Sequence, residues 1–192
     1  MRTASRPMDQ WNTIRWPTIE RTVCTLQKRI YRAAQRGDDR HVRRLQKLLL
    51  RSHYATLLAV RQVTQDNRGK KTPGVDGLAA LTPAERRTLA EPLPLDGNAA
   101  PGRRVYIPKP GTLEPRPLGI PTIADRAKQG LVTQALEPEW DARFEPNSDG
   151  FRPGRSTWDA IGAIDVQINQ QPTWVRDADL AKGFDGIDHE AL

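Results

Sequence analysis

Residues 17–37 read PTIERTVCTLQKRIYRAAQRG, a stretch in which apolar side chains recur at steps of four and three residues. They are Ile19, Val23, Leu26, Ile30 and Ala33. This spacing predicts an α-helix with one apolar face. Pro17 suits the first helical position, and Gly37 is well placed to end the helix.

A second helix is expected directly after the first, because Asp38 or Asp39 can cap its N-terminus. Its core-facing positions are Val42, Leu45, Leu49 and, further on, Leu57 and Val60. Two amphipathic helices joined by a short connection bury their apolar faces against each other. The front of the chain is therefore predicted to be a pair of packed helices.

Basic side chains repeat along both predicted helices. The first helix carries Arg29, Arg32 and Arg36, and the second carries Arg40, Arg44, Lys47 and Arg51 at the spacing of one helical face. A solvated surface is one interpretation of such a stripe. Within each helix, acidic residues at i+3 or i+4 that would neutralise the stripe are absent, which favours binding to phosphates.

The net charge agrees with this interpretation. The 192 residues carry a formal charge of +7, with a sequence pI near 10.0. Residues 1–71 hold 17 Lys and Arg against 5 Asp and Glu, whereas residues 72–192 hold 13 against 18. A basic front of this kind indicates a polyanionic partner, with nucleic acid the first to consider.

Several protein classes are disfavoured. Cys24 is the single cysteine, so neither an intrachain disulfide framework nor a multi-cysteine zinc site can form. The cysteine is expected to be a small buried apolar residue. No apolar run reaches the ~20 residues of a membrane span, and residues 1–16 lack the apolar core of a signal peptide. We expect a cytoplasmic protein with no membrane partner.

The rest of the chain mixes helices and strands, which predicts an α+β fold. Turn-rich segments are expected at 67–77 and 92–102, helices at 83–89, 124–136 and 158–168, and strands at 103–107, 118–120 and 174–180. Pro115 and Pro117 confine the second strand to an edge or to the start of a hairpin. The loop at 92–102 is taken as a boundary between domains 1–95 and 96–192.

A pair of carboxylates lies on the last predicted strand. Asp177 and Asp179 project from the same face of a strand, because side chains alternate. Two such carboxylates suggest Mg²⁺, although a lone D-x-D is more often a surface feature.

Longer motifs resemble one known family. RRVYIPKP (103–110), RPLGIPTIADRAKQ (116–129), ALEPEW (135–140), FEPNSDGFRPGRS (144–156) and DADLAKGFDGIDHEAL (177–192) resemble the early reverse-transcriptase blocks of bacterial group II intron-encoded proteins. Earlier motifs resemble the N-terminal domain that precedes those blocks, namely LQKRIYRAA (26–34), LLLRS (48–52) and LLAVRQVTQDNRGKKTPGVDG (57–77). The resemblance implies a basic helical region followed by the fingers and the first part of the palm of a right-hand polymerase.

The resemblance also implies roles for particular residues. Asp179 would ligate Mg²⁺ and serve catalysis, and Phe184 would be the steric gate against a nucleotide 2′-hydroxyl, although its residue type alone would suggest core packing. Lys109 and Arg116 would hold the triphosphate in the fingers. Further basic positions would line the nucleotide or template site, namely Arg126, Arg152 and Arg155.

This sequence departs from the family pattern at three positions. Asp149 stands where the family usually has an aromatic residue, Gly183 where a bulkier residue precedes the gate, and Glu114 where a basic residue is common. After Asp179 no Tyr-x-Asp-Asp segment follows before Leu192, so the other metal-binding carboxylates of the family are absent from these residues.

We therefore expect the N-terminal portion of a group II intron RNA-directed DNA polymerase and maturase, inactive as an isolated 192-residue chain. It would bind structured intron RNA, an RNA template with its DNA primer, and deoxynucleotides. Mg²⁺ would be the cofactor of the completed enzyme, and a second polypeptide would be needed if the missing part of the palm is supplied in trans. The alternative is a non-catalytic RNA-binding module, or a remnant, from a truncated or split maturase gene.

Overall fold

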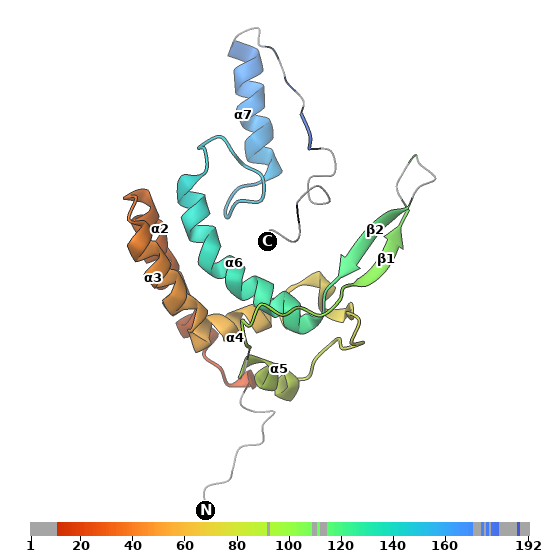
Figure 1. Cartoon of the computed structure of the whole chain (residues 1–192). Helices are drawn as coiled ribbons and strands as arrows, with labels where there is room; N and C mark the ends of the chain where they lie inside the picture. Colours follow the sequence, from red (N-terminus) through yellow and green to blue (C-terminus); the bar gives the residue numbers. More distant parts are fainter. Residues whose placement is uncertain are drawn as a thin grey trace, which may run out of the picture. The chain divides into compact units, whose positions relative to one another are not determined.

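The computed structural model describes residues 11–91, 93–108, 111, 115–170, 174, 176, 178–180 and 188. The chain forms two compact units, Met1–Phe144 and Glu145–Leu192, which are treated separately. The first unit contains most of the helices and a β-hairpin, and the second contains one helix (Figure 1). This mixture of helices with a small sheet is compatible with the predicted α+β class.

The first two predicted helices begin where their sequence signals lie. Helix α2 spans Trp16–Gln35, with a proline in its first turn, and the chain then turns at Gly37, whose φ is +70°. Helix α3 spans Asp39–Leu50, and the Asp38 side chain accepts a hydrogen bond from the backbone N–H of His41 at 3.0 Å. Both signals are therefore confirmed.

The second predicted helix is in fact two helices. Helix α3 ends at Leu50, Ser52 is extended with ψ of 118°, and helix α4 begins at His53 and spans His53–Arg61. Leu57 and Val60 do face the core, but on this third helix. Helix α4 is buried around much of its circumference because it packs against α2, α5 and α6, so a single apolar stripe could not describe it.

After α4 the helical geometry of the chain changes twice within ten residues. A π-helical turn, η1, covers Gln62–Asp66, and a 3₁₀ turn, η2, covers Arg68–Lys71 within the predicted loop. Helix α5 spans Pro83–Ala90 and confirms the short helix expected there. Its capping box is complete, because Thr82 and Glu85 each accept a hydrogen bond from the other's backbone N–H.

Helix α6, Ile123–Arg143, is the centre of the first unit. It packs against α2, α3 and α4, as Figure 1 shows. Ile30, Leu49, Val60 and Leu131 are each at most 1% exposed in the surrounding core. Burial of one such side chain contributes about 1.5–3 kcal/mol, so this core is the main source of stability for the unit.

The predicted end of α6 at residue 136 was wrong, because the helix continues through Pro138 to Arg143. Proline has no N–H, so the carbonyl of Gln134 loses its helical donor. The Nε2 of Gln27, on α2, donates to this oxygen at 3.0 Å. The neighbouring carbonyl of Ala135 accepts from Gln46 on α3 at 3.3 Å. Side chains of packed helices thus satisfy the carbonyls near the proline.

The two strands predicted around residues 103–120 form a hairpin. Strand β1, Arg103–Ile107, pairs antiparallel with strand β2, Arg116–Ile120. Tyr106 lies opposite Pro117 in this register, and a proline is tolerated because both strands of a two-stranded sheet are edges.

In the second unit, helix α7 spans Thr157–Gln170 and confirms the last predicted helix. Of the strand expected at 174–180, the described residues, which are Trp174, Arg176 and 178–180, adopt no strand conformation. A strand needs a hydrogen-bonded neighbour, and the described residues of this unit offer none. Asp177 lies outside the described residues.

Two further side chains of the first unit can also be placed. Trp11 lies in the core at 1% exposure, and its Nε1 donates to Gln65 Oε1 at 3.0 Å. The prediction that Cys24 is buried was wrong, because it lies on the exposed side of α2. Within the described part of the chain, no helix has the length and apolar character needed to cross a bilayer.

Candidate nucleic-acid interface

The cations predicted to bind phosphate lie on the outer faces of α2 and α3. We call them the basic helical surface, and all of them are exposed: Arg29, Arg32, Arg36, Arg40, Arg44, Lys47 and Arg51. Across the described residues, none of these side chains forms an ion pair. Their charge is therefore available to a ligand.

Two acidic residues of α2 and α3, Glu20 and Asp39, pair with cations outside this surface. Arg143, at the end of α6, contacts Asp39 at 2.6 Å and Glu139 at 2.8 Å. Arg61, at the end of α4, contacts Glu20 at 2.8 Å. These ion pairs leave the basic helical surface uncompensated, which is the electrostatic condition for phosphate binding.

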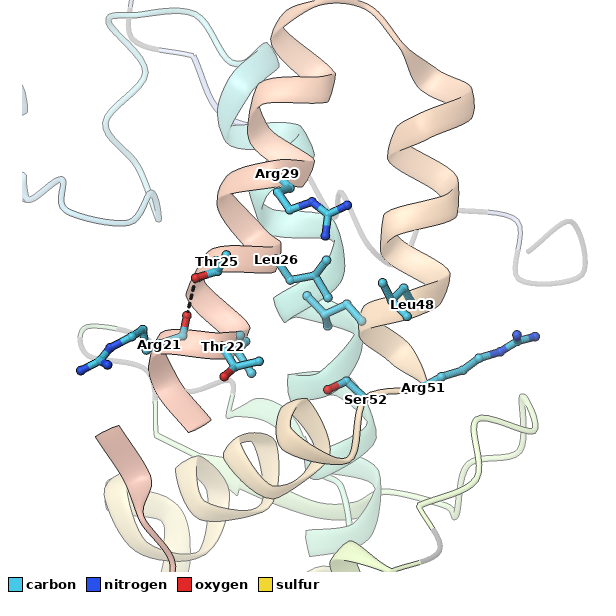
Figure 2. Close-up of a pocket in the computed structure, with 10 residues that line it drawn as sticks. Arg21, Thr22, Thr25, Leu26, Arg29, Leu48, Arg51 and Ser52 are labelled. Carbon is cyan, nitrogen blue, oxygen red and sulfur yellow. Dashed lines mark hydrogen bonds between the residues drawn. The ribbon is translucent and has the colours of Figure 1, made fainter. Parts of the chain in front are cut away.

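A groove of about 530 Å³ runs between α2 and α3 beside this surface (Figure 2). Its apolar floor includes Leu26 from α2 and Leu48 from α3, and Leu48 is 53% exposed. Arg21, Arg29 and Arg51 belong to its rim. Figure 2 shows Arg29 extending toward α3, with Arg21 and Arg51 directed away on the two sides.

The sequence interpretation missed two residues of this groove. Arg21 precedes Arg32 by eleven residues, a spacing of about three helical turns that returns to nearly the same helical face, so the basic pattern could have been extended to it. Leu48 follows Lys47 outside the apolar spacing of α3, and this irregularity was the available signal. Both line the groove between α2 and α3.

Arg126 was predicted to contact a nucleotide, and the structure places it at the base of the loop 67–77. Its guanidinium donates to the carbonyls of Gly69 at 2.9 Å, Thr72 at 2.5 Å and Thr122 at 3.4 Å. A Cβ on Gly74 would lie 2.6 Å from Thr122 Cα, so the loop meets the start of α6 backbone to backbone. In this arrangement Arg126 holds the loop against α6.

Arg116 lies exposed at the start of β2, opposite Ile107. Lys109, its predicted partner in triphosphate binding, lies outside the described residues. Arg103 on β1 donates through Nε to the carbonyl of Pro73 at 3.0 Å, which ties the hairpin to the loop 67–77. The strand that pairs with the Arg116 strand is therefore anchored to the loop 67–77.

In the second unit, the two predicted cations stabilise the turn before α7. Arg152 donates to the carbonyls of Glu145 and Ser148, each at 3.0 Å. Arg155 pairs with Asp149 at 2.8 Å, and the Asp149 side chain is only 7% exposed. The acidic residue that departs from the family pattern thus neutralises one of the cations that the family pattern assigns to nucleic acid.

Asp179 is exposed, and its Oδ1 accepts a hydrogen bond from the backbone N–H of Leu180 at 2.8 Å. Carboxylate oxygen is a suitable ligand for Mg²⁺, but the ion needs several such groups together. In the part of the chain that is described, no three His, Cys, Asp or Glu side chains gather into a metal site. The described residues alone therefore do not fit a two-metal centre, and Phe184 lies outside them.

Comparisons with known proteins agree with these features. The family described as N-terminal domain of reverse transcriptase matches residues 11–93, and the family described as reverse transcriptase (RNA-dependent DNA polymerase) matches residues 107–192. Protein YkfC of Escherichia coli is 35% identical over 182 residues, which cover 88% of this chain and 46% of that protein.

Two further relatives carry informative names. Maturase-like protein 1 of Euglena gracilis is 35% identical over 147 residues, 71% of this chain and 30% of that protein. The group II intron-encoded protein LtrA of Lactococcus lactis is 33% identical over 171 residues, 86% of this chain and 28% of that protein. The chain thus spans less than half the length of these relatives. By both family matches and these relatives, the chain belongs to the reverse transcriptases of the group II intron maturase type.

Proposed function

We propose that this chain forms the RNA-binding and nucleotide-binding front part of a group II intron RNA-directed DNA polymerase and maturase. In this proposal the basic helical surface binds structured intron RNA. The observation that carries it is the set of exposed, unpaired cations on α2 and α3, whose acidic neighbours are occupied by Arg61 and Arg143.

The chemistry of this surface suits a folded RNA. Lys and Arg side chains that contact phosphates release condensed counterions, so the affinity falls steeply as salt rises. The groove beside the surface adds apolar contact at Leu26 and Leu48. Recognition would rest mainly on the shape and phosphates of the RNA.

The polymerase role rests on the family membership and on the positions of its motifs. Arg116, with Lys109 beside it, would bind the triphosphate of an incoming deoxynucleotide, with Arg126 supporting the site by holding the loop. Phe184 would exclude a 2′-hydroxyl, and Asp179 would be one ligand of Mg²⁺. The bound ions would supply activation of the primer hydroxyl and charge stabilisation at the phosphates. We also propose the division into domains 1–95 and 96–192.

The RNA-binding proposal is tested by anisotropy measurements with a labelled structured intron RNA over a salt series. Replacement of Arg40, Arg44 and Lys47 by Gln should weaken binding at least tenfold at low salt. It should also make the slope of log affinity against log salt shallower by about 2 to 3, as expected from lost phosphate contacts.

A matched variant controls for net charge. Replacement of Arg15, Arg68 and Arg104 by Gln also removes three exposed cations, but from outside the basic helical surface. This control should leave the salt slope nearly unchanged. Equal losses in the two triple variants would show that the RNA senses only the net charge and would reject the surface.

A non-catalytic RNA-binding module is the second candidate. It is favoured by the internal hydrogen bonds and ion pair of Arg126, Arg152 and Arg155, in contrast to the free cations on α2 and α3. The two candidates differ in nucleotide binding. A polymerase front part should bind a deoxynucleoside triphosphate, and Arg116→Ala should weaken that binding whereas Arg104→Ala on the same hairpin should not. If the chain shows no saturable binding of a deoxynucleoside triphosphate, the non-catalytic RNA-binding module is favoured.

A further inference from the structure

A second basic site lies away from the basic helical surface, where η1, η2 and α5 meet. It is a pocket of about 310 Å³. Its lining residues are Thr64, Gln65, Lys70, Lys71, Ala80 and Arg86. The lining contains three cations and no acidic residue, so a positive potential is expected inside it.

Arg86 is the least satisfied polar side chain of this pocket. Its Nε is buried, and among the described residues no acceptor lies within hydrogen-bonding distance of it. Burial lowers the pKa of Arg86 from its ordinary value. A buried guanidinium N–H without an acceptor is costly, and such a group is usually completed by a ligand or by water.

The other donors of the pocket are held in place by the fold. Lys70 Nζ donates to the carbonyl of Gln65 at 2.6 Å, which leaves further protons of the ammonium for a ligand. Gln65 Oε1 accepts from Trp11, so the amide NH₂ of Gln65 remains a donor. Lys71 is exposed beside them.

The acidic residues closest in sequence are occupied elsewhere. Glu85 accepts hydrogen bonds from the N–H of Thr82 at 2.6 Å and from its hydroxyl at 2.8 Å in the capping box. Asp66 lies 3.6 Å from Arg61 Nε. Neither carboxylate lines the pocket, so the fold itself supplies no counter-charge to Arg86 there.

The backbone at the pocket wall is also unusual. Ala80 has a φ of +52°, a left-handed conformation that a residue with a Cβ rarely adopts. Its N–H donates to the carbonyl of Lys70 at 3.0 Å, which holds the two walls together. Strained backbone that persists beside unsatisfied donors is more frequent at ligand sites than elsewhere.

We propose that this pocket is an oxyanion site that binds one phosphate group, with Arg86 as its inner donor and Lys70 and Lys71 at its mouth. A guanidinium can hold two phosphate oxygens with its fork of N–H groups, and ammonium groups add charge. The phosphate could belong to free inorganic phosphate or to the backbone of a bound RNA. The site contains none of the residues of the basic helical surface, so the two proposals can be tested independently.

The site is tested on the 192-residue chain by NMR of arginine side-chain Nε–Hε groups, with the Arg86 signal identified by its loss in Arg86→Lys. Inorganic phosphate is titrated against sodium chloride at equal ionic strength, and a short RNA is titrated separately. A saturable shift of the Arg86 signal is expected. A shift with inorganic phosphate assigns free phosphate as a ligand, and a shift with RNA alone assigns the phosphodiester backbone. No shift with either ligand overturns the proposal.

Variants give a second readout. Lys71→Gln alters an exposed side chain and should keep the fold, yet weaken binding of the active ligand about tenfold, as for a lost charged hydrogen bond. Arg87→Gln is the control, because Arg87 lies next to Arg86 on α5 but pairs with Glu91 at 3.2 Å outside the pocket. Equal weakening by Lys71→Gln and Arg87→Gln would show a diffuse charge effect and would also overturn the site.

Discussion

The outer face of α2 and α3 and the surroundings of α6 both contain arginine side chains, but these are unpaired on the outer face and paired around α6. On the outer face, cations such as Arg40 and Arg44 project into solvent without acidic partners. Around α6, Arg126 donates to three carbonyls, and Arg143 pairs with two carboxylates. Residue type therefore does not distinguish a cation that is available to a ligand from one that is used to hold the fold together.

The difference arises from what lies next to each side chain. A cation near α6 meets carbonyls and carboxylates from loops and helices that are distant in sequence, and it satisfies them. Among the described residues, a cation on the outer face has no carbonyl or carboxylate partner. Substitutions near α6 should consequently change stability, whereas those on the outer face should change RNA affinity.

The largest stability effect is expected for Arg126→Ala. It removes the donor for the carbonyls of Gly69 and Thr72, so the free energy of unfolding should fall by about 2–3 kcal/mol. Urea denaturation followed by tryptophan fluorescence measures this change. The control Arg44→Ala, on the outer face, should stay within about 0.5 kcal/mol. Similar losses in the two variants would remove the contrast between the regions.

A smaller effect is expected for Gln27→Met, which removes the donor to the carbonyl of Gln134 where Pro138 interrupts α6. The free energy of unfolding should fall by about 1 kcal/mol, because a buried acceptor loses its partner. The same denaturation measurement applies.

A double-mutant cycle makes that test specific. In Pro138→Ala the backbone N–H of residue 138 is restored and can bond to the carbonyl of Gln134. Gln27→Met should then cost markedly less in the Pro138→Ala background than in the original chain. An unchanged cost would mean that Gln27 acts through packing alone.

The smallest effect concerns Asp96, an exposed acid beside Lys128. Hydrogen bonds from the side chain of Asn98, then from its backbone N–H and from Lys128, lower the pKa of Asp96 from 3.8 to about 2. A lowered pKa in the folded state stabilises the protein above pH 3.8, and this contribution is lost as the pH falls through about 2.

Asp96→Asn should therefore lower the urea midpoint at pH 6, and the difference from the original chain should shrink between about pH 4 and pH 2. Asp76→Asn is the control, because Asp76 accepts a hydrogen bond from Leu78 but has no cationic partner among the described residues. A difference for Asp96→Asn that is constant with pH would exclude this explanation.

Local sequence signals predicted much of the fold. Gly37 and Asp38 mark the junction of α2 and α3, and the proline and capping residues mark the start of α5. The alternation in residues 103–107 predicted a strand that does pair in a hairpin. These predictions were correct because each of these features depends on neighbours within a few residues.

The candidate sites could be predicted from the sequence only in part. The spacing of Arg40, Arg44 and Lys47 located the basic helical surface, whereas Arg21 and Leu48 were overlooked in its groove. The pocket at Arg86 could not be found from spacing, because its lining comes from η1, η2 and α5 and depends on how they meet.

The sequence by itself determined the helical periodicity, the hairpin, the basic stripe and the motifs that mark the family. Only the tertiary structure decided that the chain breaks at Ser52, that α6 continues through Pro138, and that Arg126 is occupied while Arg44 is free. The physical reason is that these outcomes depend on hydrogen-bond partners and packing surfaces supplied by distant segments. Helix spacing and capping, in contrast, depend on interactions within one or two turns of the chain.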